Sequence, residues 1–198
     1  MAEATEQMEH AEHAQHAENK RIALLIAVLA LFLSFSETLG KSAQTEAIDA
    51  NVKTSDTWAF FQAKDIRKTT LLTAADQTNL LASGLSDPAA KATIEKQLEA
   101  WRKTAARYES DPQTGTGRKE LGEKAKEYEA THTLSMTKYH HYELASAAFQ
   151  IGIVLASATV ITAIMPLAWI SGALGIIGLF LMGLGLYAPH VLTFLQAE

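Results

Sequence analysis

The residues best suited to chemistry stand near the start of the chain, where a three-residue unit repeats. His10, His13 and His16 recur at every third position, and Glu9 and Glu12 lie among them. On a helix these side chains would be neighbours. Imidazole and carboxylate groups bind Zn, Cu or Ni, and imidazole also titrates near neutral pH. The repeat therefore allows a metal site or a pH-responsive tail, beside the simpler interpretation as an exposed, Ala-rich segment.

A second candidate is Glu37, which follows a long apolar run. An ionisable group at membrane depth is costly and often marks a functional position. Its place near the end of the run favours an i,i+4 ion pair with Lys41. The alternative is that Glu37 and Gln150 line a pore or handle protons.

Catalytic motifs are not found in the sequence. With no Cys the chain has neither a thiolate nucleophile nor a disulfide framework. Gly115-Thr116-Gly117 with Lys119 lacks the glycine spacing of a phosphate-binding loop. A net charge of -5 without a basic stripe argues against nucleic acid as a partner. We therefore expect no enzyme activity and no cofactor.

Three aromatic residues occur within the charged segment SDTWAFFQAKDIRK, which covers residues 55–68. Trp58 and Phe61 share one helix face, whereas Phe60 points away from both. In a continuous helix Trp58 would lie roughly 28 Å beyond Leu39, too far for an interfacial aromatic belt. We expect these aromatics to pack inside a helical bundle and against another copy of the chain. A ligand groove and a fold-back onto lipid are the alternatives.

The elements that position these residues include three apolar segments. Residues 22–39, 145–165 and 167–187 are each about long enough to cross a bilayer as a helix. Pro166 lies between the last two segments, which should therefore form a tight hairpin. The lipid bilayer is thus an expected partner. Lys and Arg flank both sides of the first segment, so the sequence leaves the membrane orientation open.

A polar region, residues 40–144, lies between the first and second membrane segments. Tails at residues 1–21 and 188–198 lie at the two ends of the chain. Asp87-Pro88 predicts a helix start. Apolar residues then recur at alternating spacings of four and three, as in a coiled coil. The predicted fold is an all-α membrane protein with one membrane helix, an antiparallel three-helix bundle and a membrane hairpin. The residues of the seam are Ile94, Leu98, Trp101, Ala105 and Tyr108.

Small residues recur at four-residue spacing in the last two apolar segments. Such faces let helix backbones approach closely in lipid. They would close the hairpin and support self-association. The predicted assembly contacts are therefore Trp58, Phe60, Phe61, Ile94, Leu98, Trp101 and Tyr108 in the polar region, and Gly152, Ala156, Gly172 and Gly175 in the membrane segments.

The segment SDTWAFFQAKDIRK, together with SETLGKSAQ at residues 36–44, resembles the signature of a bacterial membrane-protein family known as domain of unknown function 4337. The resemblance extends from Lys20 to the last apolar segment and implies a bacterial plasma membrane protein. It implies no activity and no site residues. The function we expect is that of a non-catalytic, homo-oligomeric scaffold or accessory subunit, with another membrane protein as a further candidate partner. A channel or transporter-like protein, or a metal or pH sensor, are the alternatives.

Overall fold

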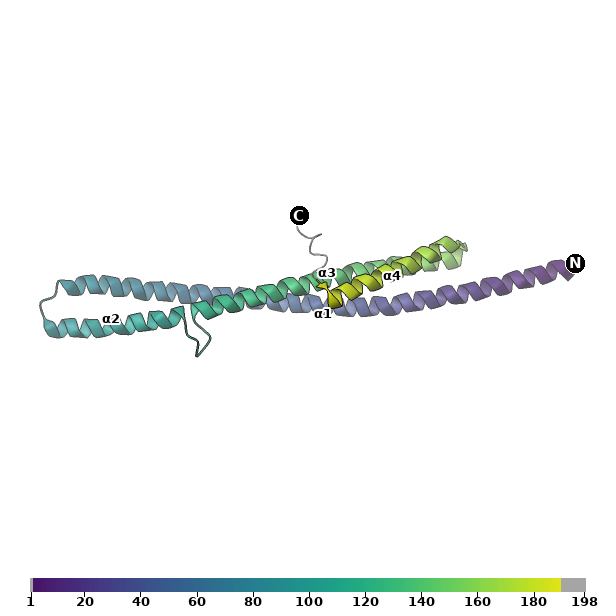
Figure 1. Cartoon of the computed structure of the whole chain (residues 1–198). Coiled ribbons are helices and arrows are strands. Elements are labelled where there is room, and N and C mark those ends of the chain that lie inside the picture. The colour runs from purple at the N-terminus through teal and green to yellow at the C-terminus, as the bar shows by residue number, and fades with distance from the viewer. Residues whose placement is uncertain (1, 190–198) are drawn as a thin grey trace. The chain divides into compact units, whose positions relative to one another are not determined.

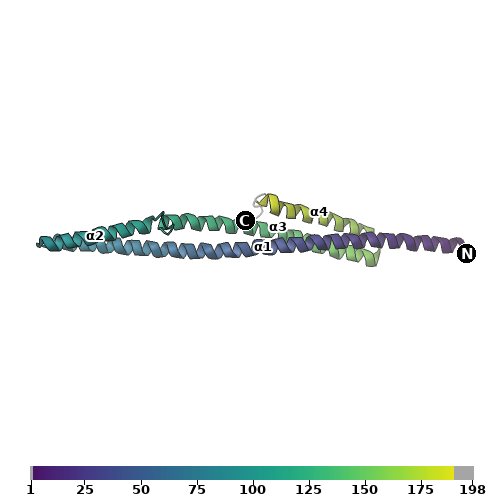
Figure 2. The ribbon, with the colours of Figure 1, turned by 90° about the horizontal axis from the view of Figure 1, so that it is seen from below.

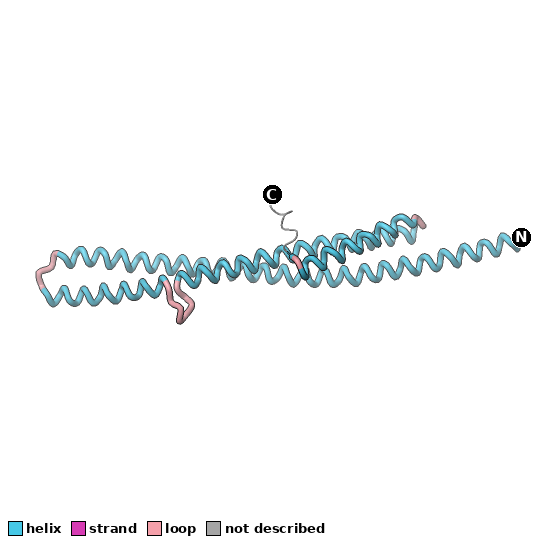
Figure 3. The backbone as a smooth tube through the Cα atoms, in the orientation of Figure 1, coloured by secondary structure: helices cyan, strands magenta, loops and turns pink. Residues whose placement is uncertain are grey.

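The described residues are almost entirely helical. The computed structural model describes the backbone of residues 2–189 and the side chains of residues 18–189. These residues form four helices and no strand. The helices are drawn in Figures 1 and 3. The predicted all-α class is confirmed. The helices are α1 (Ala2–Ser83), α2 (Pro88–Glu109), α3 (Arg118–Thr162) and α4 (Met165–Tyr187).

Two compact units divide the chain. One contains the residues up to 47 and those from 133 onward, and the other is formed by residues 48–132. Three helices, α1, α3 and α4, are long and apolar enough to cross a membrane. Large apolar side chains stay exposed on all three, including Leu24 at 66%, Ile161 at 85% and Ile176 at 71%. Lipid would cover such side chains in a membrane, whereas water would disfavour them.

The first unit has a small apolar core. Phe149 is fully buried, packs with Leu29 and Ala145, and stacks on Phe32 with ring centroids 6.1 Å apart. Helix α4 returns alongside α3 (Figure 2) after a short break at residues 163–164. Pro166 lies in the first turn of α4, where a missing N–H costs no hydrogen bond.

The second unit is built on a regular seam along α1, which we call the inner seam. Its residues recur at spacings of four and three, the pattern of a coiled coil. Every one of them is buried or half-buried, because α2 and the start of α3 pack against this face. The inner seam consists of Ala50, Thr54, Thr57, Phe61, Lys64, Lys68, Leu71, Ala75, Thr78 and Ala82.

The ends of α2 follow the sequence prediction. Asp87 caps its N-terminus by accepting a hydrogen bond from the Ala89 N–H at 2.9 Å, and Pro88 follows as the first helical residue. Leu98 and Ala105 are buried, and Ile94, Trp101 and Tyr108 are half-buried. The predicted seam of α2 therefore lies on its packed face.

The arrangement within residues 48–132 differs from the three-helix bundle that we expected. Figures 1 and 2 show α2 and the start of α3 following one another along α1, rather than lying beside one another. The cause is the loop of residues 110–117, coloured pink in Figure 3. It leaves the helical path and returns to it, so the chain continues in its original direction.

Candidate functional site

A network of charged side chains holds the base of this loop. Arg118, the first residue of α3, donates to both carboxylate oxygens of Glu109 at 3.0 and 3.2 Å, and to Asp65 at 2.7 Å. Lys68 donates to Glu109 at 2.7 Å. The hydrogen bonds from Lys68 and then Arg118 lower the pKa of the Glu109 carboxyl. One guanidinium thus joins the end of α2, the start of α3 and the inner seam side of α1.

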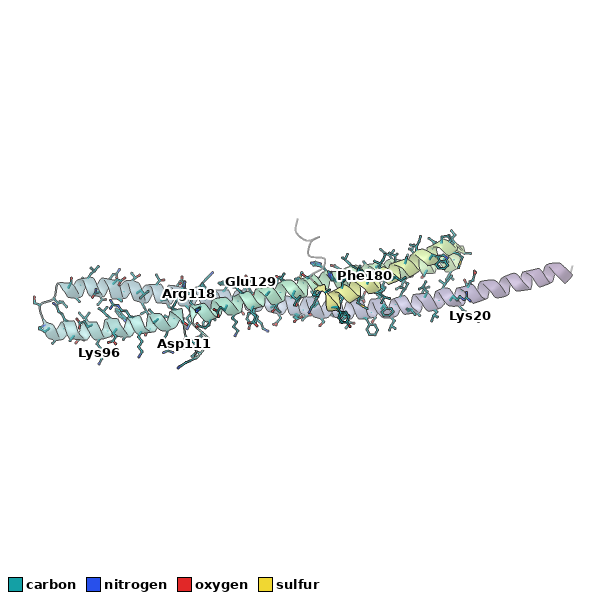
Figure 4. All side chains as sticks on the ribbon, viewed as in Figure 1. Lys20, Lys96, Asp111, Arg118, Glu129 and Phe180 are labelled. Atoms are coloured by element: carbon teal, nitrogen blue, oxygen red, sulfur yellow. The ribbon has the colours of Figure 1, made fainter. Side chains whose placement is uncertain are left out.

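The loop itself closes on Glu120, whose carboxylate accepts hydrogen bonds from the Ser110 hydroxyl and the Asp111 N–H. The hydrogen bond from Ser110 lowers the pKa of Glu120. Figure 4 shows Asp111 and Arg118 close together at the base of the loop. At Gly117 a Cβ atom would stand 2.6 Å from the Ser110 Cα. The loop that contains Gly115 and Gly117 joins α2 to α3. The absence of a side chain at Gly117 allows the two ends of this loop to lie close together.

The aromatic residues of segment 55–68 make their contacts inside the second unit. Trp58 and Phe61 meet edge to face, with centroids 5.2 Å apart, and the Phe61 ring lies against Gly122 and under Arg118. The Trp58 indole donates to Glu129 at 3.3 Å. Phe60 is 45% exposed. Two of the three aromatics thus pack within the chain as predicted, and their contact with another copy stays a prediction.

A groove of about 420 Å³ lies in the first unit, between α1 and α3. Gln150 donates to Glu37 at 3.3 Å across it, so the structure brings the two predicted pore-lining residues together. Among the described residues Glu37 forms no ion pair with Lys41, which also lines the groove. The expected i,i+4 pair is replaced by a contact between helices. The remaining lining includes Glu143, Tyr139, Ser146 and Gln44.

The two helices that line the groove approach each other closely. Ser36 is fully buried and donates its hydroxyl hydrogen to the Tyr142 carbonyl at 2.9 Å. A Cβ atom on Gly40 would stand 3.3 Å from the Tyr142 Cβ, so glycine is what allows this contact. The groove offers two carboxylates, one ammonium and two amides. Such a set can bind a polar or zwitterionic group by charge-assisted hydrogen bonds.

The small residues of the membrane segments divide into two sets. Gly152 lies against Leu29 and Ser171, Gly175 against Leu29, and Gly178 against the Phe149 ring. The Ser171 hydroxyl donates to the Gly152 carbonyl at 2.7 Å, and Ala156 is buried. These residues therefore close contacts within the first unit. Gly172 instead has open space where a side chain would stand.

The histidine residues give one result that the sequence did not indicate. His141 is 2% exposed, and its Nε2 has no hydrogen-bond partner in the part of the chain that the structure describes. The neighbouring His140 lies 3.5 Å from Glu143. A Cβ atom on Gly185 would stand 3.1 Å from the His141 Cβ, so the small residue at position 185 was the available signal. The side chains of His10, His13 and His16 lie outside the described residues.

These features define a class of protein: an all-helical chain with three helices long and apolar enough to cross a membrane. The family model described as Domain of unknown function (DUF4337) matches residues 18–188, and the chain belongs to this family. The resemblance seen in the sequence is confirmed. No curated protein and no solved structure matches the chain.

Proposed function

We propose that this protein is a non-catalytic, multi-pass protein of a bacterial plasma membrane that assembles with copies of itself as a scaffold or accessory subunit. One observation carries the proposal. Residues 48–132 lie outside the apolar segments, yet they expose large apolar side chains. Among them Ile66 is 67%, Leu80 73% and Leu81 77% exposed. Neither lipid nor the rest of the unit covers these residues, so a protein surface is the natural cover.

The charged and aromatic cluster around Arg118 supports the same proposal. It fixes three helical segments to one another through hydrogen bonds and ring contacts within the unit. A preformed, rigid surface loses little conformational entropy on binding, which favours association. In this proposal Arg118 has a structural role.

Two differently tagged copies of the full chain, expressed together, test this proposal. Capture through one tag in mild detergent should recover the other. Mixing membranes that each contain only one tagged copy, and then solubilising them, gives the control for association after extraction. Absence of the second tag from the co-expressed sample would contradict self-assembly.

A second candidate function is supported by the contact between Glu37 and Gln150 in the groove. Here an oligomer would conduct an ion or a small polar solute past these side chains. Glu37→Gln removes the charge while keeping the size, and it should reduce flux into liposomes. Unchanged flux would remove Glu37 from the path. The metal or pH sensor built on His10, His13 and His16 stays a prediction, to be tested by zinc binding with and without residues 1–19.

A further inference from the structure

Helix α1 carries a second repeat on the face opposite its inner seam. Its ten residues again recur at spacings of four and three, and all ten are exposed. Four of them are large and aliphatic, with exposed fractions from 53% to 73%. We call this repeat the outer stripe. It consists of Ile48, Val52, Ser55, Ala59, Gln62, Ile66, Thr69, Thr73, Asp76 and Leu80.

The outer stripe carries fewer charged residues than the exposed faces of α2 and of the start of α3. Asp76 is its single charged residue. The exposed positions of α2 and of the start of α3 carry many charges, as solvated helix faces do. The charged exposed residues there are Lys91, Glu95, Lys96, Glu99, Arg102, Lys103 and Arg107 in α2, and Lys119, Glu123, Lys124, Lys126, Glu127 and Glu129 in α3.

A sustained spacing of four and three is the requirement for a left-handed coiled coil with a further helix. The inner seam already satisfies this requirement on one face of α1. The same requirement is met on the opposite face, where no helix lies among the described residues. We therefore propose that the outer stripe binds the outer stripe of a second copy of this chain, in parallel and in register. This inference rests on the proposed self-assembly and specifies its surface.

We assign the partner as a second copy of the chain because each residue of the outer stripe can pack against the same residue of a second outer stripe. In a parallel, in-register pair each position meets its own equivalent, so Val52, Ala59, Ile66 and Leu80 form apolar layers. Gln62 and Thr69 form layers of groups that both donate and accept hydrogen bonds. Copies inserted in one membrane share one orientation, which imposes the parallel arrangement. Confinement to a membrane also raises the effective concentration of the partner.

Two of the three carboxylates next to stripe residues are compensated within their own chain. Asp49 forms an ion pair with Lys53 at 2.7 Å, and Asp65 pairs with Arg118 at 2.7 Å. Asp56, next to Ser55, is exposed and forms no ion pair in the described part of the chain. Asp76 is the one layer that would bring like charges together, and it lies next to the end of the repeat.

Cysteine cross-linking of the full chain in its membrane tests the inference, since the chain has no Cys of its own. Single Cys substitutions are made at each position from 59 to 73, and disulfide-linked dimer is measured after mild oxidation. A disulfide needs Cα atoms about 4.4–6.8 Å apart. Dimer should therefore be greatest at positions 59, 62, 66, 69 and 73. Ile66→Cys should give at least about five times more dimer than the adjacent, exposed Arg67→Cys.

Asp76→Leu supplies a second measurement that does not depend on disulfides. It replaces the like-charge layer with an apolar one, so it should increase the dimer fraction of the otherwise native chain. Lys96→Leu on α2 adds the same side chain outside the stripe and should leave that fraction unchanged.

Three results would overturn the inference. The first is a maximum of cross-linking at inner seam positions. The second is cross-linking of Ile66→Cys without cross-linking of Ala59→Cys and Thr73→Cys, which would indicate an antiparallel pair. The third is that Ile66→Cys gives no more dimer than Arg67→Cys. If co-purification still shows self-association, only the outer stripe is excluded as its surface. If co-purification also fails, the proposed function falls with the inference.

Discussion

Arg118 donates to Asp65 across 2.7 Å, a contact that joins the first residue of α3 to the middle of α1. The same guanidinium reaches Glu109 at the end of α2 and covers the Phe61 ring at 5.4 Å. A single side chain therefore compensates two carboxylates and fixes the point where α2 gives way to α3.

Replacing Arg118 with Gln should lower the free energy of unfolding by more than the loss of a single exposed ion pair does. Single exposed ion pairs contribute less than about 1 kcal/mol, but Arg118 belongs to a network and also loses its ring contact. Thermal unfolding followed by helical circular dichroism measures the change. Arg107→Gln is the matched control, because the Arg107 side chain is 68% exposed and, in the described part of the chain, forms an ion pair only with Asp111. Equal effects of the two substitutions would contradict a special role for Arg118.

Acid should weaken the second unit through Glu109 and Glu120. The pKa of each carboxyl is lowered in the folded chain, by hydrogen bonds from Lys68 and Arg118 and from Ser110 respectively. A carboxylate with a lowered pKa stabilises the fold above its unfolded pKa, and this stabilisation is lost as pH falls through the folded value. The melting temperature should therefore stay level from pH 7 to about 5 and fall below about pH 4.5. In Glu109→Gln the acid-induced decrease should be smaller, and an unchanged profile would exclude Glu109 as a contributor.

The sequence predicts much of this fold because helix signals are local. The apolar segments, the Asp87-Pro88 helix start and the seam through Leu98 and Ala105 can all be recognised from neighbouring residues. The path of the loop cannot be recognised from neighbouring residues. Pro112 and Gly115 predict a break, but whether the chain reverses or continues depends on contacts of Glu120 with Ser110 and Asp111. These contacts form only once the helices are placed.

The candidate sites were predictable to a lesser degree. Glu37 and Gln150 stand out as polar residues within apolar segments, and they do meet. The Glu37 pair with Lys41 failed as a prediction because helical spacing ignores a partner on another helix. Burial of His141 depends on the close approach of Gly185, a contact between helices that periodicity does not reveal.

Gly117→Ala should destabilise the second unit by about 1–3 kcal/mol, the usual cost of overpacking. The added Cβ would meet backbone atoms of Ser110 and Asp111 at 2.6 and 2.5 Å, which cannot move without opening the loop. Gly84→Ala places its Cβ 3.7 Å from the nearest atom and serves as control. Chemical denaturation of both variants measures the difference. Equal stability of the two would mean that the loop base tolerates a side chain.

Gly178→Ala should loosen the first unit, because the new Cβ would lie 2.7–2.8 Å from the Phe149 ring at the centre of the core. A Cβ atom on Gly172 would have open space around it, so Gly172→Ala should not change the stability of the single chain. Loss of helical signal on titration with a denaturing detergent compares them. Any effect of Gly172→Ala confined to oligomer size would place that residue in an assembly contact.

Copies of this chain are expected to form a defined assembly within a membrane. The most direct test is the mass of the purified full-length protein in a lipid nanodisc, after subtraction of lipid and belt protein. We expect a single species that contains two or more copies of the chain. A single copy, or a complex in which this chain is accompanied only by a different protein, would contradict it.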